Sequence, residues 1–312
     1  MAISKNIYYY MVMLSYQHAY HAGNHADILK HFVLQFVLNS LNKKEKPYTF
    51  FDTHSGSGLY DLIDNRSLKT GEAKSGIQTL FSKADIIPEL ESYTNLVRPY
   101  MEKNLYPGSP EIERSMMRAG DHLILSELHP QEVKNLNHNM KEPVINGPAK
   151  ASVQVHNRNG WEMLKALTPP ATKRGAALID PSYEEASDYS DAADTICQVH
   201  KKWSNGIIML WYPLLAHREA EIENMVERIS ESARVLNANI EISDLRLEVF
   251  DKNAHVETSL EEVLSDEGKK NPPRLYGSGM LVLNSPWHLQ ETADAAISYL
   301  KSVISHQSQG EC

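Results

Sequence analysis

Gly175-Ala-Ala-Leu-Ile-Asp-Pro-Ser-Tyr183 is the stretch of sequence that decides the fold. Its apolar first half is typical of a strand buried in a parallel sheet, and the run stops abruptly at Asp180. In open α/β sheets, ligands bind just beyond such strand ends. The Asp180 carboxylate, a nearby backbone carbonyl and the Tyr183 ring would together suit an exocyclic amine on a planar base. An ordinary strand end with a proline turn has the same pattern, so the rest of the chain has to decide.

The composition is that of a globular protein with a large core. The 312 residues are 42% hydrophobic and 23% charged, which favours one large α/β domain or such a domain with an insert. Only two cysteines occur, Cys197 and Cys312, which excludes a cysteine-based metal site and favours a reducing cytoplasm. The formal net charge of −9 argues against diffuse coating of nucleic acid but leaves local basic patches open.

The first thirteen residues contain a Tyr-rich apolar run that is too short to span a bilayer and lacks a cleavage pattern. We therefore expect residues 1–13 to be a disordered extension, with no association with a membrane. Met13 directly precedes a strongly patterned segment, so translation is suspected to start there.

The segment from Leu14 to His31 is rich in polar groups and leads into a helix, for which Asn24 is the expected N-cap with Asp27 in the first turn. Four histidines in this segment resemble a metal-binding box: His18, His21, His25 and His31. They straddle an Ala-Gly-Asn break and lack paired i, i+4 spacing on one helix, so no metal site is predicted.

A second strand, Tyr48 to Asp52, runs directly into Thr53-His54-Ser55-Gly56-Ser57-Gly58. Such a strand with an acidic end and a glycine turn lets a ligand approach the backbone closely. The turn is not Gly-x-Gly-x-x-Gly, and it lacks the Lys-Ser/Thr of a phosphate loop. A nicotinamide-dependent dehydrogenase is therefore disfavoured.

The spacing after this turn indicates an insertion. An acidic residue that holds ribose hydroxyls should follow about 20 residues later, but the next strand is His122 to Glu127. We interpret residues 62–103 as a small inserted subdomain of two or three helices, with 14–61 and 104–312 forming the main domain. Ser109 is the expected cap of the helix that follows the insert. Glu127 would then stand where a ribose ligand needs a carboxylate.

The remaining pattern alternates regularly between strands and helices. Further strands are expected at Ser152–His156, at 175–180, and at Gly206–Trp211, Asn239–Val249 and Gly279–Asn284, with a mobile loop at 250–276. Six or seven strands in this order predict a doubly wound, mainly parallel sheet. Asn284-Ser285-Pro286-Trp287 is a second candidate amine site. Topology favours Asp180, because its strand would lie beside the glycine-turn strand and three further strands would complete the sheet.

These strand ends are together the parts of an S-adenosylmethionine site that faces an amine. From Leu14 to about Trp287 the chain resembles the RlmJ family of bacterial 23S ribosomal RNA adenine-N6 methyltransferases. The resemblance implies a seven-stranded Rossmann-like methyltransferase sheet, S-adenosylmethionine as cofactor, 23S ribosomal RNA as partner, a cytoplasmic location and a monomer. The pieces that carry it are Leu14–His31, Asp52-Thr53-His54, Tyr106-Pro107-Gly108-Ser109-Pro110, Glu127-Leu128-His129-Pro130, Trp211-Tyr212-Pro213 and Ser278-Gly279-Met280.

Transferred to this sequence, the resemblance implies a set of residues that contact the cofactor or line its pocket: His31, His54, Ser109, Glu127, Asn159, Gly160 and Asp180. Asp180 would also be the catalytic acceptor. Two positions depart from the family pattern, Ser182 in place of a second proline and Asn159 in place of an acidic residue.

Other side chains are predicted to serve the nucleic acid. Tyr183 would stack on the flipped target base, and Tyr16 and His18 would fold over the site as a lid. Lys30 would meet an RNA phosphate, and the basic residues of the insert, Lys69 and Lys74, would contact RNA. Three alternatives stay open at this stage: a DNA adenine methyltransferase, a protein amide methyltransferase of the same fold, and a non-catalytic RNA-binding relative.

Overall fold

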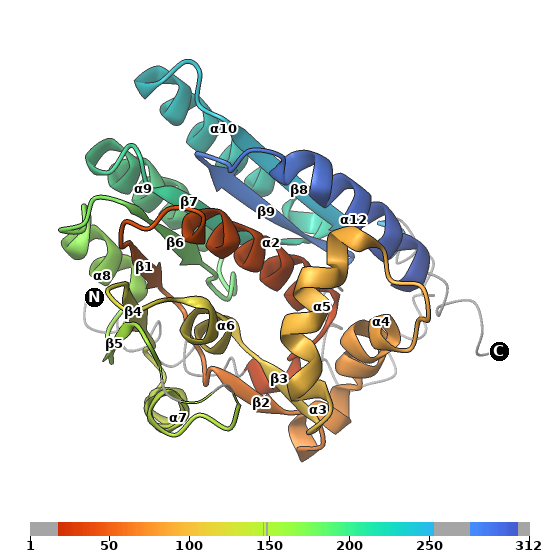
Figure 1. Ribbon diagram of the computed structural model, residues 1–312. Coiled ribbons are helices and arrows are strands. Elements are labelled where there is room, and N and C mark those ends of the chain that lie inside the picture. The colour runs from red at the N-terminus through yellow and green to blue at the C-terminus, as the bar shows by residue number, and fades with distance from the viewer. Residues whose placement is uncertain (1–17, 146, 148, 253–274, 305–312) are drawn as a thin grey trace, which may run out of the picture.

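The computed structural model describes residues 18–145, 147, 149–252 and 275–304 (Figure 1). Three predictions lie outside these residues: the disordered extension at 1–13, the lid role of Tyr16, and nearly all of the mobile loop at 250–276. Within the described residues, no helix combines the length and the apolar character that crossing a bilayer requires.

A seven-stranded sheet organises the described part of the chain. Every neighbouring pair of strands is parallel except the pairs that involve β9, which runs antiparallel to both β7 and β8. The predicted doubly wound, mainly parallel sheet is confirmed. From one edge to the other, the strands are β5 (Ser152–His156), β4 (His122–Ser126), β1 (Thr49–Asp52), β6 (Gly175–Ile179), β7 (Ile207–Leu214), β9 (Gly277–Leu283) and β8 (Ile242–Glu248).

Helices cover both faces of this sheet, because its central strands are apolar on both sides. All residues of β6 and β9 are buried. One face packs against α2 (His25–Asn42), α6 (Ser109–Met116), α7 (Pro130–Lys141) and α12 (Leu289–Ile304). The other packs against α8 (Gly160–Leu167), α9 (Ser187–Lys202) and α10 (Glu219–Leu236), which the short η3 (Ala216–Arg218) precedes (Figure 1).

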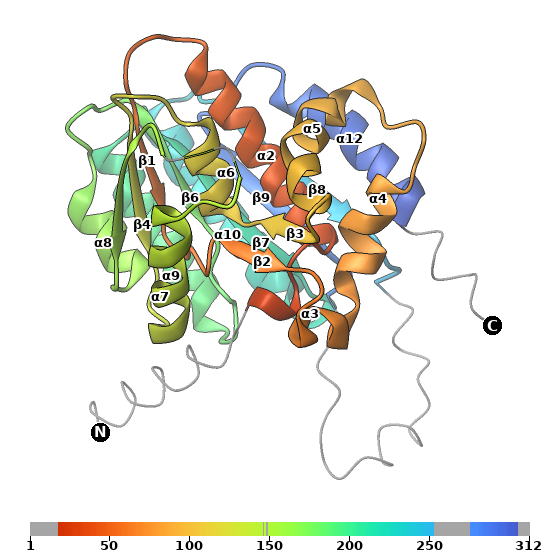
Figure 2. The same ribbon diagram turned by 60° about the horizontal axis from the view of Figure 1, so that its bottom comes forward.

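The predicted insert begins and ends at a two-stranded antiparallel ribbon formed by β2 (Leu59–Asp61) and β3 (Leu105–Pro107). Its helices pack against α2 and α12 and share their apolar core, and Figure 2 shows α4 and α5 grouped beside α12. The division of the chain into a main domain and an inserted subdomain remains a proposal. The helices of this segment are α3 (Asn65–Thr70), η2 (Lys74–Gln78), α4 (Thr79–Phe81) and α5 (Pro88–Met101).

The strand that ends at Asp180 lies where the topology argument places it. β6 pairs with β1 in parallel, with Asp52 opposite Leu178. The rival candidate Asn284 follows the antiparallel strand β9, so it lies at the end of the strands opposite to Asp180. There its side-chain amide donates hydrogen bonds to the carbonyl oxygens of Ser204 (2.9 Å) and Gly206 (2.7 Å), just before β7 begins. Asn284 therefore has a structural partner and stands far from the carboxyl ends of the parallel strands.

Candidate active site

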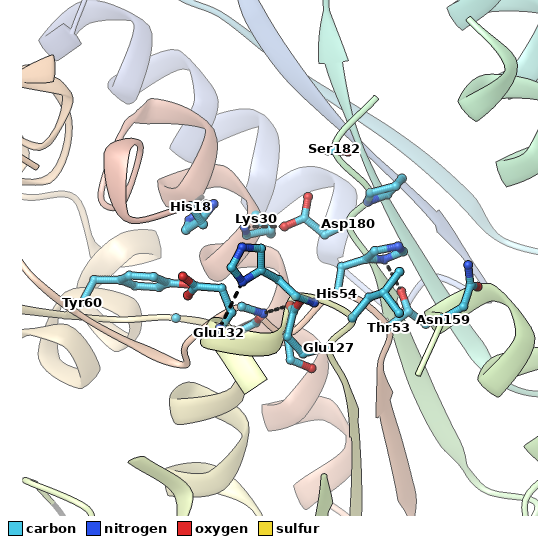
Figure 3. A pocket seen from close by; sticks show the side chains of 18 of the residues that line it. His18, Lys30, Thr53, His54, Tyr60, Glu127, Glu132, Asn159, Asp180 and Ser182 are labelled. Atoms are coloured by element: carbon cyan, nitrogen blue, oxygen red, sulfur yellow. Dashed lines mark hydrogen bonds and ion pairs between the residues drawn. The ribbon is translucent and has the colours of Figure 1, made fainter. Parts of the chain in front are cut away.

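A cleft with about 870 Å³ of empty space opens at the carboxyl ends of β1, β4, β5 and β6 (Figure 3). It forms there because these strands are parallel, so the turns that follow them all lie at the same end of the strands. The cleft brings together all seven residues predicted to surround the cofactor, and His18 and Lys30 as well: His18, Lys30, His31, His54, Ser109, Glu127, Asn159, Gly160 and Asp180.

Glu127 stands at the end of β4 with its carboxylate held by backbone. One oxygen accepts the N–H of Gly56 (2.8 Å) and the other accepts the N–H of His129 (2.7 Å). Burial raises the pKa of this carboxyl, and the two N–H donors oppose that rise. Each carboxylate oxygen has further lone pairs. The group is therefore oriented to accept hydrogen bonds from a pair of hydroxyls, such as those of a ribose.

Small residues bring the backbone close to the cleft. Gly56 has a left-handed conformation (φ 57°), which a residue with a side chain adopts only at a cost. A Cβ at Gly160 would collide with the carbonyl oxygen of Thr53. The start of α8 therefore rests directly on the turn after β1. Asn159 caps α8, because its Oδ1 accepts the N–H of Glu162 (3.1 Å), so the residue that replaces an acid still has a defined structural role.

Two buried imidazoles on the cleft wall have a nitrogen without a hydrogen-bond partner among the described residues. His31 contacts the Tyr106 hydroxyl through Nδ1 (2.8 Å), and His54 contacts the Thr53 hydroxyl through Nδ1 (2.8 Å), but the Nε2 atom of each ring is buried and unpaired. Burial lowers the pKa of His31 to about 3 and that of His54 to about 4, so both rings are neutral near pH 7. Unpaired buried polar atoms are costly, and their presence fits a cleft that holds a polar ligand such as S-adenosylmethionine.

Asp180 lies at the opposite side of the cleft from Glu127 and pairs with Lys30. The Lys30 Nζ is 2.6 Å from Oδ2 of Asp180 and 2.8 Å from Oδ1 of Asp27. Only 4% of Lys30 is exposed. This placement does not fit the predicted contact between Lys30 and an RNA phosphate, because a buried ammonium between two carboxylates does not face an incoming chain. Its carbon stem crosses the space between α2 and β6 instead.

The Tyr183 ring is not at the cleft. The residue adopts φ 52°, which turns the side chain away from Asp180 and into the core between β7 and α9. Its ring lies 4.6 Å from that of Tyr189, its hydroxyl donates to the Met225 sulfur (3.7 Å), and 6% of the residue is exposed. The predicted stacking of Tyr183 on the target base does not match this position. Ser182, which replaces the usual second proline, lines the cleft instead.

Ser109 also differs from its predicted local role. The N-cap of α6 is Gly108, and the Ser109 hydroxyl donates to Oδ2 of Asp52 (2.7 Å) rather than capping the helix. Burial raises the pKa of Asp52 to about 7, although hydrogen bonds from Ser109 and the His54 N–H oppose the rise. Glu113 on α6 is fully buried beside Asp52. Two carboxyl groups with raised pKa values therefore lie beneath the cleft.

Glu113→Gln is expected to gain stability relative to the parent protein as the pH rises from about 5 to about 8. The pKa of Glu113 lies well above its ordinary value, first because of burial and then because of the nearby Asp52. The folded state therefore keeps a proton that the unfolded state releases, so rising pH favours unfolding of the parent, and glutamine cannot titrate. Urea unfolding at both pH values measures the difference. A difference in unfolding free energy that is independent of pH would contradict the prediction.

Sequence reasoning missed three side chains of this region. Asp27 pairs with Lys30, Tyr60 forms a wall of the cleft with its ring 5.2 Å from that of His18, and Glu132 is buried beside Ser57. A signal for Asp27 was present, since it precedes Lys30 by three positions and therefore shares its helix face. Lys69 and Lys74 are exposed on the insert and do not line the cleft.

Comparison with known proteins gives consistent results. A family model described as "Ribosomal RNA large subunit methyltransferase D, RlmJ" matches residues 45–259. Two relatives are each named Ribosomal RNA large subunit methyltransferase J. The one from Escherichia coli (strain K12) is 34% identical over 295 residues, 94% of each chain. The one from Haemophilus influenzae is 33% identical over 302 residues, 96% of each chain.

A solved structure matches the fold over nearly the same length. Protein LPL1258 from Legionella pneumophila superposes with a TM-score of 0.72 at 28% sequence identity, covering 91% of this chain and 94% of that one.

Proposed function

This chain belongs to the RlmJ family of ribosomal RNA large subunit methyltransferases, and from that premise we propose that it transfers a methyl group from S-adenosylmethionine to the N6 amine of an adenine in 23S ribosomal RNA. The observation that carries the proposal is the position of Asp180. Its carboxylate stands at the end of β6, beside the glycine turn of β1, in the same cleft as Glu127 and Asn159. An amine held by Asp180 would thus lie next to the cofactor.

The chemistry of adenine explains why a carboxylate is needed. The N6 lone pair is delocalised into the ring, so this amine is a poor nucleophile. A hydrogen bond from N6–H to Asp180 favours a more tetrahedral nitrogen whose lone pair can attack. S-adenosylmethionine supplies the methyl group on a positively charged sulfur. As the new N–CH₃ bond forms and the S–CH₃ bond breaks, positive charge moves to N6, and Asp180 can accept the proton that N6 then releases.

The ribose and the adenine of the proposed cofactor have matching groups in the cleft. The Glu127 carboxylate supports the ribose hydroxyls, and Asn159 and Gly160 lie where the adenine ring would meet the start of α8. The neutral rings of His31 and His54 each bring an unpaired Nε2 to the wall. These contacts bind and orient the cofactor, which matters because methyl transfer needs an in-line approach within a few Å.

The test is methylation of large-subunit ribosomal RNA with isotope-labelled S-adenosylmethionine, followed by digestion and mass spectrometry of the nucleosides. We expect label in N6-methyladenosine. Label in another nucleoside would exclude the N6 assignment. Equal or better methylation of a DNA duplex or of a protein would favour one of the other substrate classes. A protein that binds RNA but shows no thermal shift with S-adenosylhomocysteine would be a non-catalytic relative.

Reversal of two charges on the insert, Lys69→Glu with Lys74→Glu, is expected to weaken RNA binding. Both side chains are exposed, on α3 and η2, and α3 packs against residues 18–20, of which His18 lines the cleft. Loss of two phosphate contacts should reduce the magnitude of the salt slope of log K by roughly 1.4–1.8, while affinity for S-adenosylhomocysteine stays unchanged. Titration of an RNA fragment at several salt concentrations measures both the RNA affinity and its salt slope.

A matched control for these reversals is Lys201→Glu with Lys202→Glu at the end of α9. There the same charge change falls at the end of the strands opposite to the cleft. If both double variants weaken RNA binding equally, only net charge matters and the insert is not a specific RNA contact.

We propose that the protein acts as a monomer in the cytoplasm. A single chain supplies Glu127, Asn159 and Asp180 to the cleft, which supports this proposal. A ribosomal RNA substrate is also a cytoplasmic one in bacteria. Light scattering during gel filtration tests the first statement directly.

A further inference from the structure

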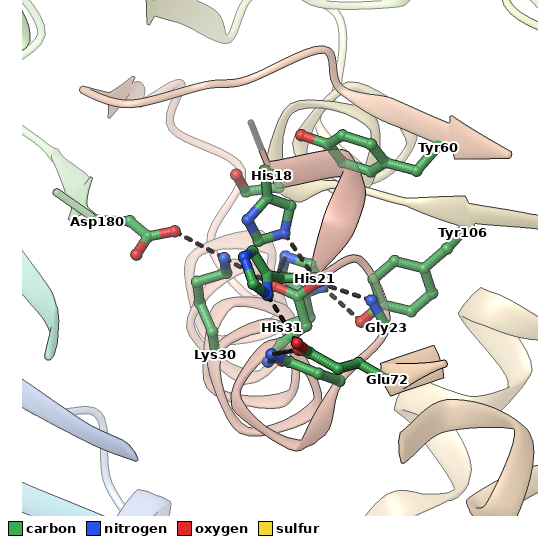
Figure 4. Close-up of polar contacts among 12 residues, drawn as sticks. His18, His21, Gly23, Lys30, His31, Tyr60, Glu72, Tyr106 and Asp180 are labelled. Atoms are coloured by element: carbon green, nitrogen blue, oxygen red, sulfur yellow. Dashed lines mark hydrogen bonds and ion pairs between the residues drawn. The ribbon is translucent and has the colours of Figure 1, made fainter. Parts of the chain in front are cut away.

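Asp27 anchors the polar cluster from which Lys30 reaches the catalytic acid. Only 1% of the residue is exposed, and its carboxylate has three partners within hydrogen-bond distance: the Lys30 ammonium (2.8 Å), the His18 Nε2 (2.9 Å) and the backbone N–H of Gly23 (2.9 Å). The His31 Nε2 lies farther away, at 4.0 Å from its Oδ1. Figure 4 shows the dashed contact from Lys30 to Asp180, with His18 close by. Asp27 itself does not line the cleft. Among the described residues it reaches the reacting region through Lys30 and His18, and the more distant His31 ring also lines the cleft.

The charges of the three linked side chains do not cancel. Burial alone would raise the pKa of Asp27, but the nearby His18 and Lys30 hold it well below its ordinary value. Burial would lower the pKa of Lys30, but Asp180 and Asp27 hold it well above its ordinary value. Two carboxylates therefore share one ammonium, and the set of Asp27, Lys30 and Asp180, counted without the His18 ring, carries a net charge of −1.

This surplus negative charge lies where the proposed reaction creates positive charge. With Asp27 present, Lys30 divides its hydrogen bonds between two acceptors, and Asp180 keeps lone pairs and negative charge for the amine. Without the Asp27 charge, the buried ammonium would pair with Asp180 alone, and the set would be neutral. Preorganised charge of this kind acts strongly in a site that excludes water.

We propose that Asp27 is a positioning residue for methyl transfer, which holds the Lys30 ammonium so that the Asp180 carboxylate stays available to the N6 amine. This inference rests on the function proposed above. It assigns Lys30 the task of orienting Asp180 rather than binding RNA, and it makes Asp27 the residue that limits how strongly Lys30 neutralises the catalytic acid.

The substitution Asp27→Asn removes the charge with little change of shape. Asparagine keeps an oxygen that can accept the Gly23 N–H. The turn before α2 also has supports that do not depend on the Asp27 charge: Asn24 caps the helix through the Asp27 N–H (2.9 Å), and the Ile77 N–H donates to the Gly23 carbonyl oxygen (2.8 Å). The variant is therefore expected to fold and to bind S-adenosylhomocysteine with parent affinity.

The decisive experiment is a double-mutant cycle with Asp27→Asn and Lys30→Met. The first variant brings the net charge of the set to 0, the second brings it to −2, and the double variant returns it to −1. We expect each single variant to lower kcat by roughly tenfold or more with little change in the KM for S-adenosylmethionine. We expect the double variant to lose less than the product of the two single losses.

The same cycle has a readout without catalysis. Lys30→Met leaves the buried Asp27 and the partly buried Asp180 without their cation, so urea unfolding should occur at lower denaturant concentration. Adding Asp27→Asn removes the repulsion between the two carboxylates, so the urea midpoint should return part of the way to that of the parent protein. If Asp27 only supports the turn before α2, the losses of unfolding free energy in the two single variants should add in the double variant. The two fold-losses of kcat should then multiply.

Asp121→Asn is the matched control, because Asp121 is equally buried but lies at the end of the strands opposite to the cleft. There its carboxylate accepts the backbone N–H groups of Tyr48 and Arg118. It should change stability and leave kcat of the folded protein unaltered. Parent-like kcat in Asp27→Asn, or multiplying losses in the cycle, would overturn the inference. Failure of the parent itself to form N6-methyladenosine would instead sink the proposed function, so the two failures are distinct.

Discussion

Asp180→Ala lowers kcat by roughly 100-fold or more, if the carboxylate polarises N6 and accepts its proton. The interaction is made mainly in the transition state, so its loss should appear in kcat rather than in the KM for RNA. The structure adds a second reason for a large effect. Removal of the carboxylate leaves the buried Lys30 ammonium paired with Asp27, so the set loses its net negative charge at the place where N6 becomes positive.

Asp180→Asn separates orientation from proton acceptance. Asparagine keeps the shape and one oxygen acceptor, but it cannot take a proton. We expect it to be nearly as poor as Ala, because the methylated nitrogen has to release a proton before the product is complete. Recovery of much of the parent rate would mean that only orientation matters. Single-turnover kinetics with S-adenosylmethionine and ribosomal RNA measures the chemical step without product release.

A control for the Asp180 variants is Asp188→Asn. Asp188 follows the same strand and is buried, but its carboxylate accepts the N–H of Glu185 outside the cleft. This variant should keep a rate close to that of the parent. An Asp180→Ala protein that methylates ribosomal RNA at the parent rate would remove Asp180 from the mechanism.

Glu127→Ala should weaken S-adenosylmethionine binding by roughly 100-fold or more. The carboxylate is positioned to take two ribose hydroxyls, and hydrogen bonds to a charged group contribute about 1.5–3 kcal/mol each. Alanine also leaves the N–H groups of Gly56 and His129 without their acceptor, so the glycine turn loses its support. Calorimetry with S-adenosylhomocysteine gives the affinity, and RNA binding in the absence of cofactor should persist.

Glu132→Gln is the companion variant for Glu127. Glu132 is buried at the same wall but binds the Ser57 hydroxyl, so a neutral side chain of equal shape should alter cofactor affinity only slightly. Unchanged affinity in Glu127→Ala would show that this carboxylate serves the turn alone and does not hold the ribose.

Strand positions could be predicted from sequence because the decisive information is local. The strand at Ser152–His156 was predicted at its observed bounds, since an alternating run is followed directly by a turn and a helix cap. β7 extends to Leu214, three residues past the prediction, because β9 pairs with it that far. The β2–β3 ribbon was missed for the same reason: strands of three residues exist through their partner across the insert, and their own sequence carries little signal.

Site residues divide in the same way. Glu127 and Asp180 are recognisable because each directly follows an apolar strand. This can be read from the sequence without knowing which residues face them in the fold. Tyr183 was expected to stack on the base, but a left-handed backbone at that residue directs its ring inward, and residue type does not determine that conformation. The partner of Lys30 was missed because 150 positions separate it from Asp180 along the chain.

The packing of α2 has a consequence for the order in which this protein matures. α2 precedes every strand of the sheet in the sequence, yet besides α5 and α6 it packs against β9 and α12, which lie near the other end of the described chain. A growing chain that has been synthesised as far as Ser182 already holds every residue that lines the cleft. It still lacks β9 and α12, which complete the packing of α2 and therefore of Lys30. The ribosome has to add about a hundred more residues before that surface exists, at roughly 5–20 residues per second. The packing that positions Lys30 is therefore complete only after β9 and α12 have been synthesised, well after the cleft residues themselves.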